Sequence, residues 1–95
     1  MKLRTLGKTG VAVSELALGG LFLASWFADA EQSAATVRRA IELGVNYIDT
    51  APGYGDSEEA LGRALRSLGG TDRPLILSTK LGGRPQPFNP QDKAA

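Results

Sequence analysis

The chain has 95 residues, of which 42% are hydrophobic, and its formal net charge is +1. Such a chain can bury at most one small core, and its balanced charge excludes charge-driven binding to nucleic acid or to an acidic membrane. Because cysteine and histidine are absent, disulfides, thiol nucleophiles and thiolate metal sites are excluded, and no metal site is predicted. Acid–base chemistry within the chain must use Asp, Glu, Lys, Tyr, Ser or Thr.

The uncharged stretch at residues 16–28 contains two adjacent glycines. It is shorter than the about 20 apolar residues that a membrane-spanning helix needs. A signal peptide is not expected either, because charged residues and a glycine-flanked turn precede the stretch. We therefore expect a cytoplasmic protein without membrane partners.

A β-hairpin is predicted at the amino terminus. Two short segments with partial apolar alternation, Lys2–Leu6 and Val11–Ser14, flank the turn Gly7–Gly10. Residues Leu16–Leu18 follow, too few for a helix and ending in two glycines, and they predict a buried strand.

The first helix has both a start and a stop signal. Asp29 is a predicted amino-terminal cap with Gln32 three residues later, and Gly44 ends the helix. The apolar face predicted to pack on the core consists of Ala34, Val37, Ala40 and Ile41. The β-branched and aromatic residues of Val45–Ile48 then predict a strand, with Asp49 at its carboxyl end.

The second helix repeats this pattern. Asp56 and Glu59 have the spacing of a capping box, and two glycines end the helix. Its predicted apolar stripe consists of Leu61, Ala64, Leu65 and Leu68. A third strand, Leu75–Thr79, follows and delivers Lys80.

The predicted strands recur at a regular interval. Their starts near Leu16, Val45 and Leu75 lie about 30 residues apart, which indicates parallel strands joined by right-handed helical crossovers. Eight such units form a (β/α)8 barrel of roughly 250 residues, and five or six form an open doubly wound sheet. A further helix start is predicted at Asn89 and Pro90. We therefore expect an α/β fold and the amino-terminal piece of a longer protein.

Three chemically useful side chains, Asp49, Tyr54 and Lys80, are predicted at the carboxyl ends of the strands, where both folds build their sites. A free phenol has a pKa of about 10, and a neighbouring ammonium favours its ionised form, so Lys80 is the candidate partner of Tyr54. Asp49 would pair with Lys80 and keep it charged. Taken singly, Asp49 could instead end its strand in a turn, Tyr54 could be an ordinary loop residue, and Lys80 could be a solvated strand end. Taken together, they favour a proton-transfer site.

The aromatic pair Trp26–Phe27 lies in the first strand-to-helix loop. It is interpreted either as core packing or as the wall of a substrate pocket, and the sequence leaves both open. The glycine pairs of the chain do not form the GxGxxG dinucleotide fingerprint.

The ordered series of motifs resembles the aldo-keto reductases. The matching segments are RTLGKTG at residues 4–10, GVNYIDTA at 44–51, YG at 54–55 and STK at 78–80. They cover nearly the whole chain in order, and APGYGD at 51–56 is similar to the branch of aldose dehydrogenases that includes the L-fucose and L-galactose types. The resemblance implies a partial (β/α)8 TIM barrel: the amino-terminal hairpin, the first three parallel strands and two helices. Residues 1–95 would then be the incomplete amino-terminal part of one barrel domain.

The resemblance also implies an activity, hydride transfer between NADP(H), or alternatively NAD(H), and an aldehyde, ketone or aldose. Asp49, Tyr54 and Lys80 would be three members of a catalytic tetrad, with Tyr54 as general acid or base. The fourth member, a histidine, has no counterpart in this sequence. Gly20, Leu21 and Asp49 would contact the nicotinamide end of the cofactor. The 95-residue chain alone is expected to be inactive.

Two alternatives remain open. The same fold serves as a non-catalytic auxiliary or sensing subunit in potassium-channel β-subunits, which resemble these reductases. The chain could also be an inactive product in its own right. Three parallel strands without closure leave a bare edge, so we expect the isolated chain to be poorly stable and to self-associate. The expected partner is a small carbonyl compound or sugar, while the particular substrate and the oligomeric state stay undetermined.

Overall fold

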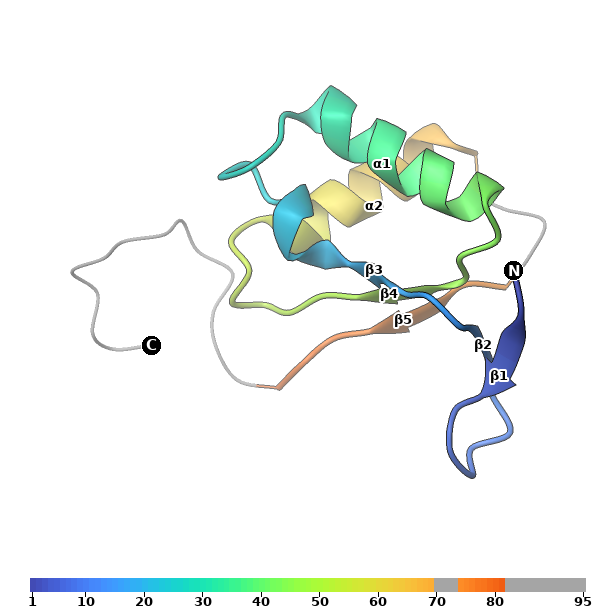
Figure 1. Cartoon of the computed structure of the whole chain (residues 1–95). Coiled ribbons are helices and arrows are strands. Elements are labelled where there is room, and N and C mark those ends of the chain that lie inside the picture. The colour runs from blue at the N-terminus through green and yellow to red at the C-terminus, as the bar shows by residue number, and fades with distance from the viewer. Residues whose placement is uncertain (70–73, 82–95) are drawn as a thin grey trace.

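The computed structural model of the chain describes residues 1–69 and 74–81. Figure 1 shows two helices on one side of a parallel sheet, with a separate hairpin at the end where the sheet strands begin. The hairpin consists of β1 (Leu3–Thr5) and β2 (Ala12–Ser14), which pair antiparallel. The predicted hairpin is therefore confirmed, with shorter strands.

Asn46 joins the hairpin to the sheet. The backbone N–H of Ser14 donates to Asn46 Oδ1 at 2.6 Å, and Asn46 Nδ2 donates to the carbonyl of Ala12 at 3.0 Å. Since Asn46 directly precedes a sheet strand, the hairpin is held at the amino ends of the strands, away from their carboxyl ends.

The sheet has three parallel strands in the order β3-β4-β5. Their bounds are β3 (Leu18–Gly19), β4 (Tyr47–Asp49) and β5 (Ile76–Ser78). One row across the sheet consists of Leu18, Ile48 and Leu77, and the next consists of Gly19, Asp49 and Ser78. The parallel pairing confirms the predicted crossovers, and the carboxyl ends of all three strands lie at one end of the sheet.

The first parallel strand differs from its prediction. Leu16, which is 64% exposed, and the exposed Ala17 both lie outside it, and Leu18 is half-buried. The prediction of a buried strand over Leu16–Leu18 is therefore wrong, except that Leu18 begins the strand. The physical reason is a bend after the hairpin, where the hydroxyl of Ser14 donates to the carbonyl of Leu16 at 2.6 Å. A short 3-10 helix that was not predicted, η1 (Gly20–Leu23), follows the strand.

The first helix, α1 (Ala30–Glu42), has the predicted cap. The backbone N–H of Gln32 donates to Asp29 Oδ1 at 2.8 Å, and the backbone N–H of Asp29 donates to Gln32 Oε1 at 3.0 Å. Gly44, with a φ of 100°, follows the helix and allows the chain to turn toward β4.

The second helix, α2 (Ser57–Ser67), does not have the predicted cap. Asp56 stands at the capping position, but its φ of −99° and ψ of 24° are not the extended conformation of a capping residue. Its carboxylate instead accepts a hydrogen bond from the backbone N–H of Ser25 at 2.7 Å. The predicted capping box of Asp56 and Glu59 is therefore wrong, because a distant backbone donor binds the carboxylate.

The core lies between the two helices and the sheet. Its buried members are Leu23, Val37, Ile48, Ala60, Leu61 and Ala64, with Leu18, Ala34, Ile41, Leu65 and Leu68 packed against them. Both predicted apolar helix faces are confirmed, except that the partly buried Ala40 is not part of this cluster.

Both helices cover the same face of the sheet (Figure 1). A barrel carries all its helices on its outer face, and each half of a doubly wound sheet also carries its helices on one face. The arrangement is therefore consistent with the predicted partial (β/α)8 barrel. Within residues 1–69 and 74–81, neither helix has the length and apolar character to cross a membrane. The predicted helix start at Asn89 lies outside the described residues.

Candidate active site

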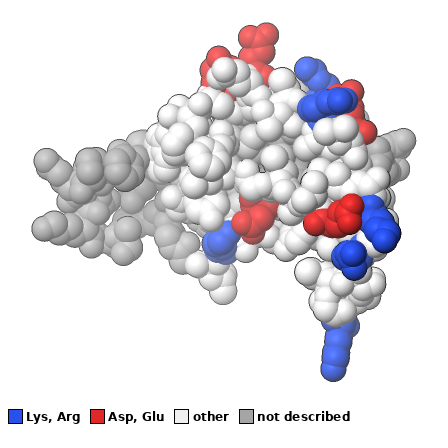
Figure 2. Space-filling view, in the orientation of Figure 1, with Lys and Arg blue, Asp and Glu red and all other residues white. Residues whose placement is uncertain are grey.

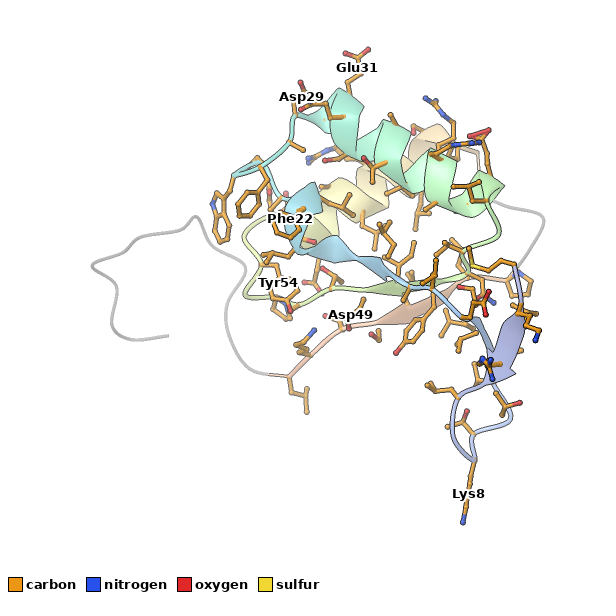
Figure 3. All side chains as sticks on the ribbon, viewed as in Figure 1. Lys8, Phe22, Asp29, Glu31, Asp49 and Tyr54 are labelled. Carbon is orange, nitrogen blue, oxygen red and sulfur yellow. The ribbon has the colours of Figure 1, made fainter. Side chains whose placement is uncertain are left out.

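The predicted site residues meet at the carboxyl ends of the sheet strands. Asp49 is the last residue of β4, Tyr54 lies in the loop between β4 and α2, and Lys80 lies two residues beyond β5. Figure 3 shows Asp49 and Tyr54 at this end of the molecule, far from Lys8 at the tip of the hairpin.

Lys80 connects the three residues. Its Nζ lies 3.0 Å from Asp49 Oδ2 and 4.9 Å from the centroid of the Tyr54 ring. The same ammonium donates to the carbonyl of Thr50 at 2.9 Å. The side chains of Lys80 and Asp49 are 46% and 44% exposed, so the pair is partly open to solvent at the carboxyl ends of β4 and β5.

Ser78 is a site residue that the sequence interpretation missed. Its hydroxyl donates to Asp49 Oδ1 at 2.5 Å, so the two carboxylate oxygens bind different partners. The signal that could have identified it is strand register, because parallel pairing places Ser78 directly beside Asp49.

These contacts shift the pKa values of the pair in opposite directions. The hydrogen bond from Ser78 and then that from Lys80 lower the pKa of the Asp49 carboxyl, against a smaller effect of burial. The hydrogen bond to Asp49 raises the pKa of Lys80, and Tyr54 contributes less in the same direction. The two groups are therefore a charged pair throughout the neutral pH range.

The loop that carries Tyr54 is held by its own hydrogen bonds. The backbone N–H of Tyr54 donates to the carbonyl of Ala51 at 3.2 Å, and the backbone N–H of Ser57 donates to the carbonyl of Tyr54 at 3.0 Å. The fully buried Ser57 hydroxyl donates to the carbonyl of Gly20 at 2.5 Å and lies 2.8 Å from the hydroxyl of Thr50. Ser57 is therefore a structural residue that joins this loop to η1.

Gly20 and Leu21, the predicted cofactor contacts, lie at the same end of the sheet. Gly20 is buried, and a Cβ there would stand 2.7 Å from the carbonyl oxygen of Asp49. This close approach requires glycine. Leu21 is half-buried in η1. Their contact with a cofactor stays a prediction.

Aromatic side chains gather above this end of the sheet. Phe22, Trp26 and Phe27 are 65%, 38% and 54% exposed, so the core interpretation of Trp26–Phe27 is wrong. The rings of Phe22 and Phe27 are 4.8 Å apart, and those of Trp26 and Phe27 are 6.2 Å apart. Figure 3 shows Phe22 at the same end of the molecule as Tyr54. We call these three residues the aromatic cluster.

The charged side chains are mixed in sign. On the face shown in Figure 2, Lys and Arg lie beside Asp and Glu around the helices and the sheet, with wide uncharged areas between them. Beside the Asp49–Lys80 ion pair, a further carboxylate, that of Glu58, accepts a hydrogen bond from the Thr79 hydroxyl at 2.7 Å.

Comparisons with known proteins agree with this geometry. The sequence profile of the Aldo/keto reductase family matches residues 15–95. L-galactose dehydrogenase of Arabidopsis thaliana is 39% identical over 93 residues, which are 94% of this chain and 29% of that protein. The "Probable voltage-gated potassium channel subunit beta" of Oryza sativa subsp. japonica is 34% identical over 97 residues, which are 98% of this chain and 28% of that protein.

Solved structures give the same result. An aldo-keto reductase of Bacillus halodurans in its holo form matches with a TM-score of 0.76 and 36% sequence identity, over 98% of this chain and 29% of that one. The chain spans less than a third of the length of each of these relatives. Because the profile covers most of the chain and the fold agrees, the chain belongs to the aldo-keto reductase family of oxidoreductases.

Proposed function

We propose that residues 1–95 form the amino-terminal part of a single aldo-keto reductase barrel domain that transfers hydride between NADP(H) and a carbonyl or alcohol group. The observation that carries this proposal is the contact set of Lys80, which binds Asp49 at 3.0 Å and lies 4.9 Å from the ring centroid of Tyr54. A carboxylate, an ammonium and a phenol in contact form a proton-delivering unit.

In this proposal Tyr54 is the general acid in carbonyl reduction and the general base in alcohol oxidation. Reduction leaves negative charge on the substrate oxygen, and a hydroxyl beside that oxygen can neutralise it by donating a proton. The positive charge of Lys80 stabilises the phenolate that remains. Asp49 holds Lys80 in place, and Ser78 holds Asp49.

NADP is the proposed cofactor and NAD the alternative. The bound cofactor would supply or accept the hydride. Gly20, Leu21 and Asp49 are proposed to hold its nicotinamide end. These residues fit that role because they bring a close-packed backbone, a half-buried apolar side chain and a carboxylate together at the strand ends. The 95-residue chain alone is proposed to be inactive, because the sequence contains no histidine to complete the family tetrad.

The proposed substrate is a small aldehyde, ketone or aldose, and a cytoplasmic location stays a prediction. An aldose is favoured by the 39% identity to L-galactose dehydrogenase. The alternative is a non-catalytic auxiliary or sensing subunit, favoured by the 34% identity to a protein named as a channel β-subunit. Turnover with a nicotinamide cofactor and small aldehydes or aldoses separates the two.

The decisive variant is Tyr54→Phe in a complete barrel that contains this chain. Loss of the proton donor is expected to lower kcat by about 10²- to 10⁴-fold. Cofactor affinity should stay unchanged, because phenylalanine keeps the ring beside Lys80. The matched control is Tyr47→Phe, which removes the hydroxyl of the other tyrosine in the chain. Steady-state kinetics and cofactor titration measure both quantities.

Two results would contradict the proposal. Normal kcat in Tyr54→Phe would remove Tyr54 from the acid–base role. Absence of turnover in the unsubstituted barrel, with retained cofactor binding, would favour the auxiliary subunit.

A further inference from the structure

The loop that follows η1 is fastened to the turn that carries Tyr54. The backbone N–H of Ser25 donates to Asp56 Oδ1 at 2.7 Å. Beside this bond the Trp26 ring lies directly on Gly55, where a Cβ would stand 2.9 Å from two of the ring carbons. Gly55 and Asp56 follow Tyr54 in the chain, so the loop contacts the backbone next to the phenol.

Asp56 is available for this contact because its side chain does not cap α2. The hydrogen bond from the Ser25 backbone lowers the pKa of the Asp56 carboxyl, with burial opposing it and Arg63 adding a minor effect. The carboxyl is therefore ionised at neutral pH. A hydrogen bond to an ionised acceptor is stronger than one between neutral groups.

The same turn is held from its other side. Ser57, the residue after Asp56, donates its hydroxyl to the carbonyl of Gly20. Positions 55, 56 and 57 are thus each in contact with the segment at residues 20–26, through ring packing, a charged hydrogen bond and a buried hydrogen bond. Of these contacts, the one made by Asp56 binds the backbone of Ser25, next to Trp26, and is open to a conservative substitution.

We propose that Asp56 is a positioning residue for Tyr54, tying the loop after η1 to the Tyr54 turn so that the phenol stays beside Lys80. The structural half of this inference concerns the packing of Trp26 on Gly55 and does not depend on the proposed function. The catalytic half rests on the proposed function, since it concerns the orientation of the proton donor.

The structural half is tested by tryptophan fluorescence of the 95-residue chain, in which Trp26 is the single tryptophan, at concentrations where sedimentation velocity shows a monomer. Asp56→Ala removes the acceptor. The ratio of molecules with a detached loop to molecules with an attached loop is expected to rise by about tenfold. Acrylamide quenching of Trp26 should increase and its emission should move to longer wavelength. Asp56→Asn keeps an acceptor oxygen but loses the charge, so its quenching should lie between that of the unsubstituted chain and that of Asp56→Ala. Glu59→Gln is the control, because it removes an exposed charge from the same helical turn.

Far-UV circular dichroism of each variant establishes that the helices are retained. If Asp56→Ala does not fold, the comparison of Asp56→Asn with Asp56→Leu, which is similar in size and lacks the acceptor, takes its place. Quenching in Asp56→Ala, or in Asp56→Leu, that equals quenching in Glu59→Gln would overturn the inference.

The catalytic half is tested in a complete barrel by separating kcat from cofactor affinity. Asp56→Ala should lower kcat by about tenfold through misplacement of the phenol, with an unchanged Kd for NADPH and with partial recovery in Asp56→Asn. If Trp26 becomes more exposed while kcat is unchanged, the positioning role is wrong. If the unsubstituted barrel has no turnover, the proposed function fails, and the quenching result still decides whether Asp56 holds the loop.

Discussion

The Asp49 carboxylate is the centre of the site at the scale of single residues. One of its oxygens accepts from Ser78 and the other from Lys80. Because Ser78 lies on the neighbouring strand in register with Asp49, the strand pairing itself fixes the carboxylate. Lys80, beyond the end of β5, is held by that carboxylate and by the carbonyl of Thr50. We therefore expect Ser78 to position Asp49, and Asp49 in turn to position Lys80 beside Tyr54.

This order predicts the response of Asp49 to substitution. Ser78→Ala removes the hydrogen bond that contributes most to the lowered pKa of Asp49, so the pKa should rise toward its usual value. Lys80→Met should raise it as well, because it removes both the hydrogen bond and the positive charge of Lys80. Carbon-13 NMR titration of the Asp49 side chain measures both changes, and Ser67→Ala, at the far end of α2, is the control. An unchanged pKa of Asp49 in Ser78→Ala would contradict this order.

The directions of the two pKa shifts define a pH window for the ion pair. The pKa of Asp49 is lowered in the folded state, so its contribution to stability is present above about pH 3.9 and is lost as the pH falls through the lower folded value. The pKa of Lys80 is raised, so its contribution is present below about pH 10.4 and is lost as the pH rises through the higher folded value. Neutral pH lies between these limits, where both contributions are complete.

At the scale of secondary-structure elements, the two helices show how one sequence pattern gives different caps. Asp29 and Gln32 form a local capping box, because the segment before α1 is extended at Asp29. Asp56 and Glu59 have the same spacing, but Asp56 turns to the backbone of Ser25. The outcome was decided by a donor 31 residues away in the sequence. A local motif predicts a cap when no distant group competes for the capping side chain.

The junction of β3 and η1 predicts a contrast between two adjacent glycines. A Cβ at Gly20 would approach the Asp49 carbonyl oxygen to 2.7 Å and the Ser57 hydroxyl to 3.1 Å, whereas a Cβ at Gly19 meets nothing within 4 Å. Gly20→Ala should lower the free energy of unfolding by about 1 to 3 kcal/mol, because backbone atoms must move. Gly19→Ala, the matched control, should leave it nearly unchanged. Urea unfolding measures both, and equal effects would show that the close approach is not tight in solution.

At the scale of the whole molecule, the sheet has an open edge at β5 within the described residues. Leu77, in the middle of this strand, is 52% exposed. Together with Leu61 and Leu65 of α2 it lines a cleft of about 210 Å³. Exposed strand edges and apolar clefts promote association between chains.

We therefore predict that the isolated 95-residue chain self-associates through this edge. Leu77→Lys should reduce association, since it places a charge in the middle of the edge strand. Leu43→Lys is the control, because Leu43 is 53% exposed at the end of α1, away from the cleft. Sedimentation velocity over a range of concentrations measures the change. A monomeric chain with a cooperative thermal transition above ~50 °C would contradict the prediction.

Some features of this protein were determined by its sequence alone. The hairpin, the alternation of strands and helices, the cap at Asp29 and the ends of β4 and β5 that bring Asp49 and Lys80 together all follow from local patterns and their spacing. Such signals suffice because helix caps, glycine turns and apolar periodicity act within a few residues.

Other features were decided by the tertiary structure. The hydrogen bond from Ser78 to Asp49, the attachment of Ser25 to Asp56 and the close approach of Gly20 to Asp49 each join residues about 30 positions apart. A bend after the hairpin likewise exposed Leu16, which local hydrophobicity predicted to be buried. These contacts depend on strand register and loop packing, which are set when the whole core forms and are not encoded in any short segment.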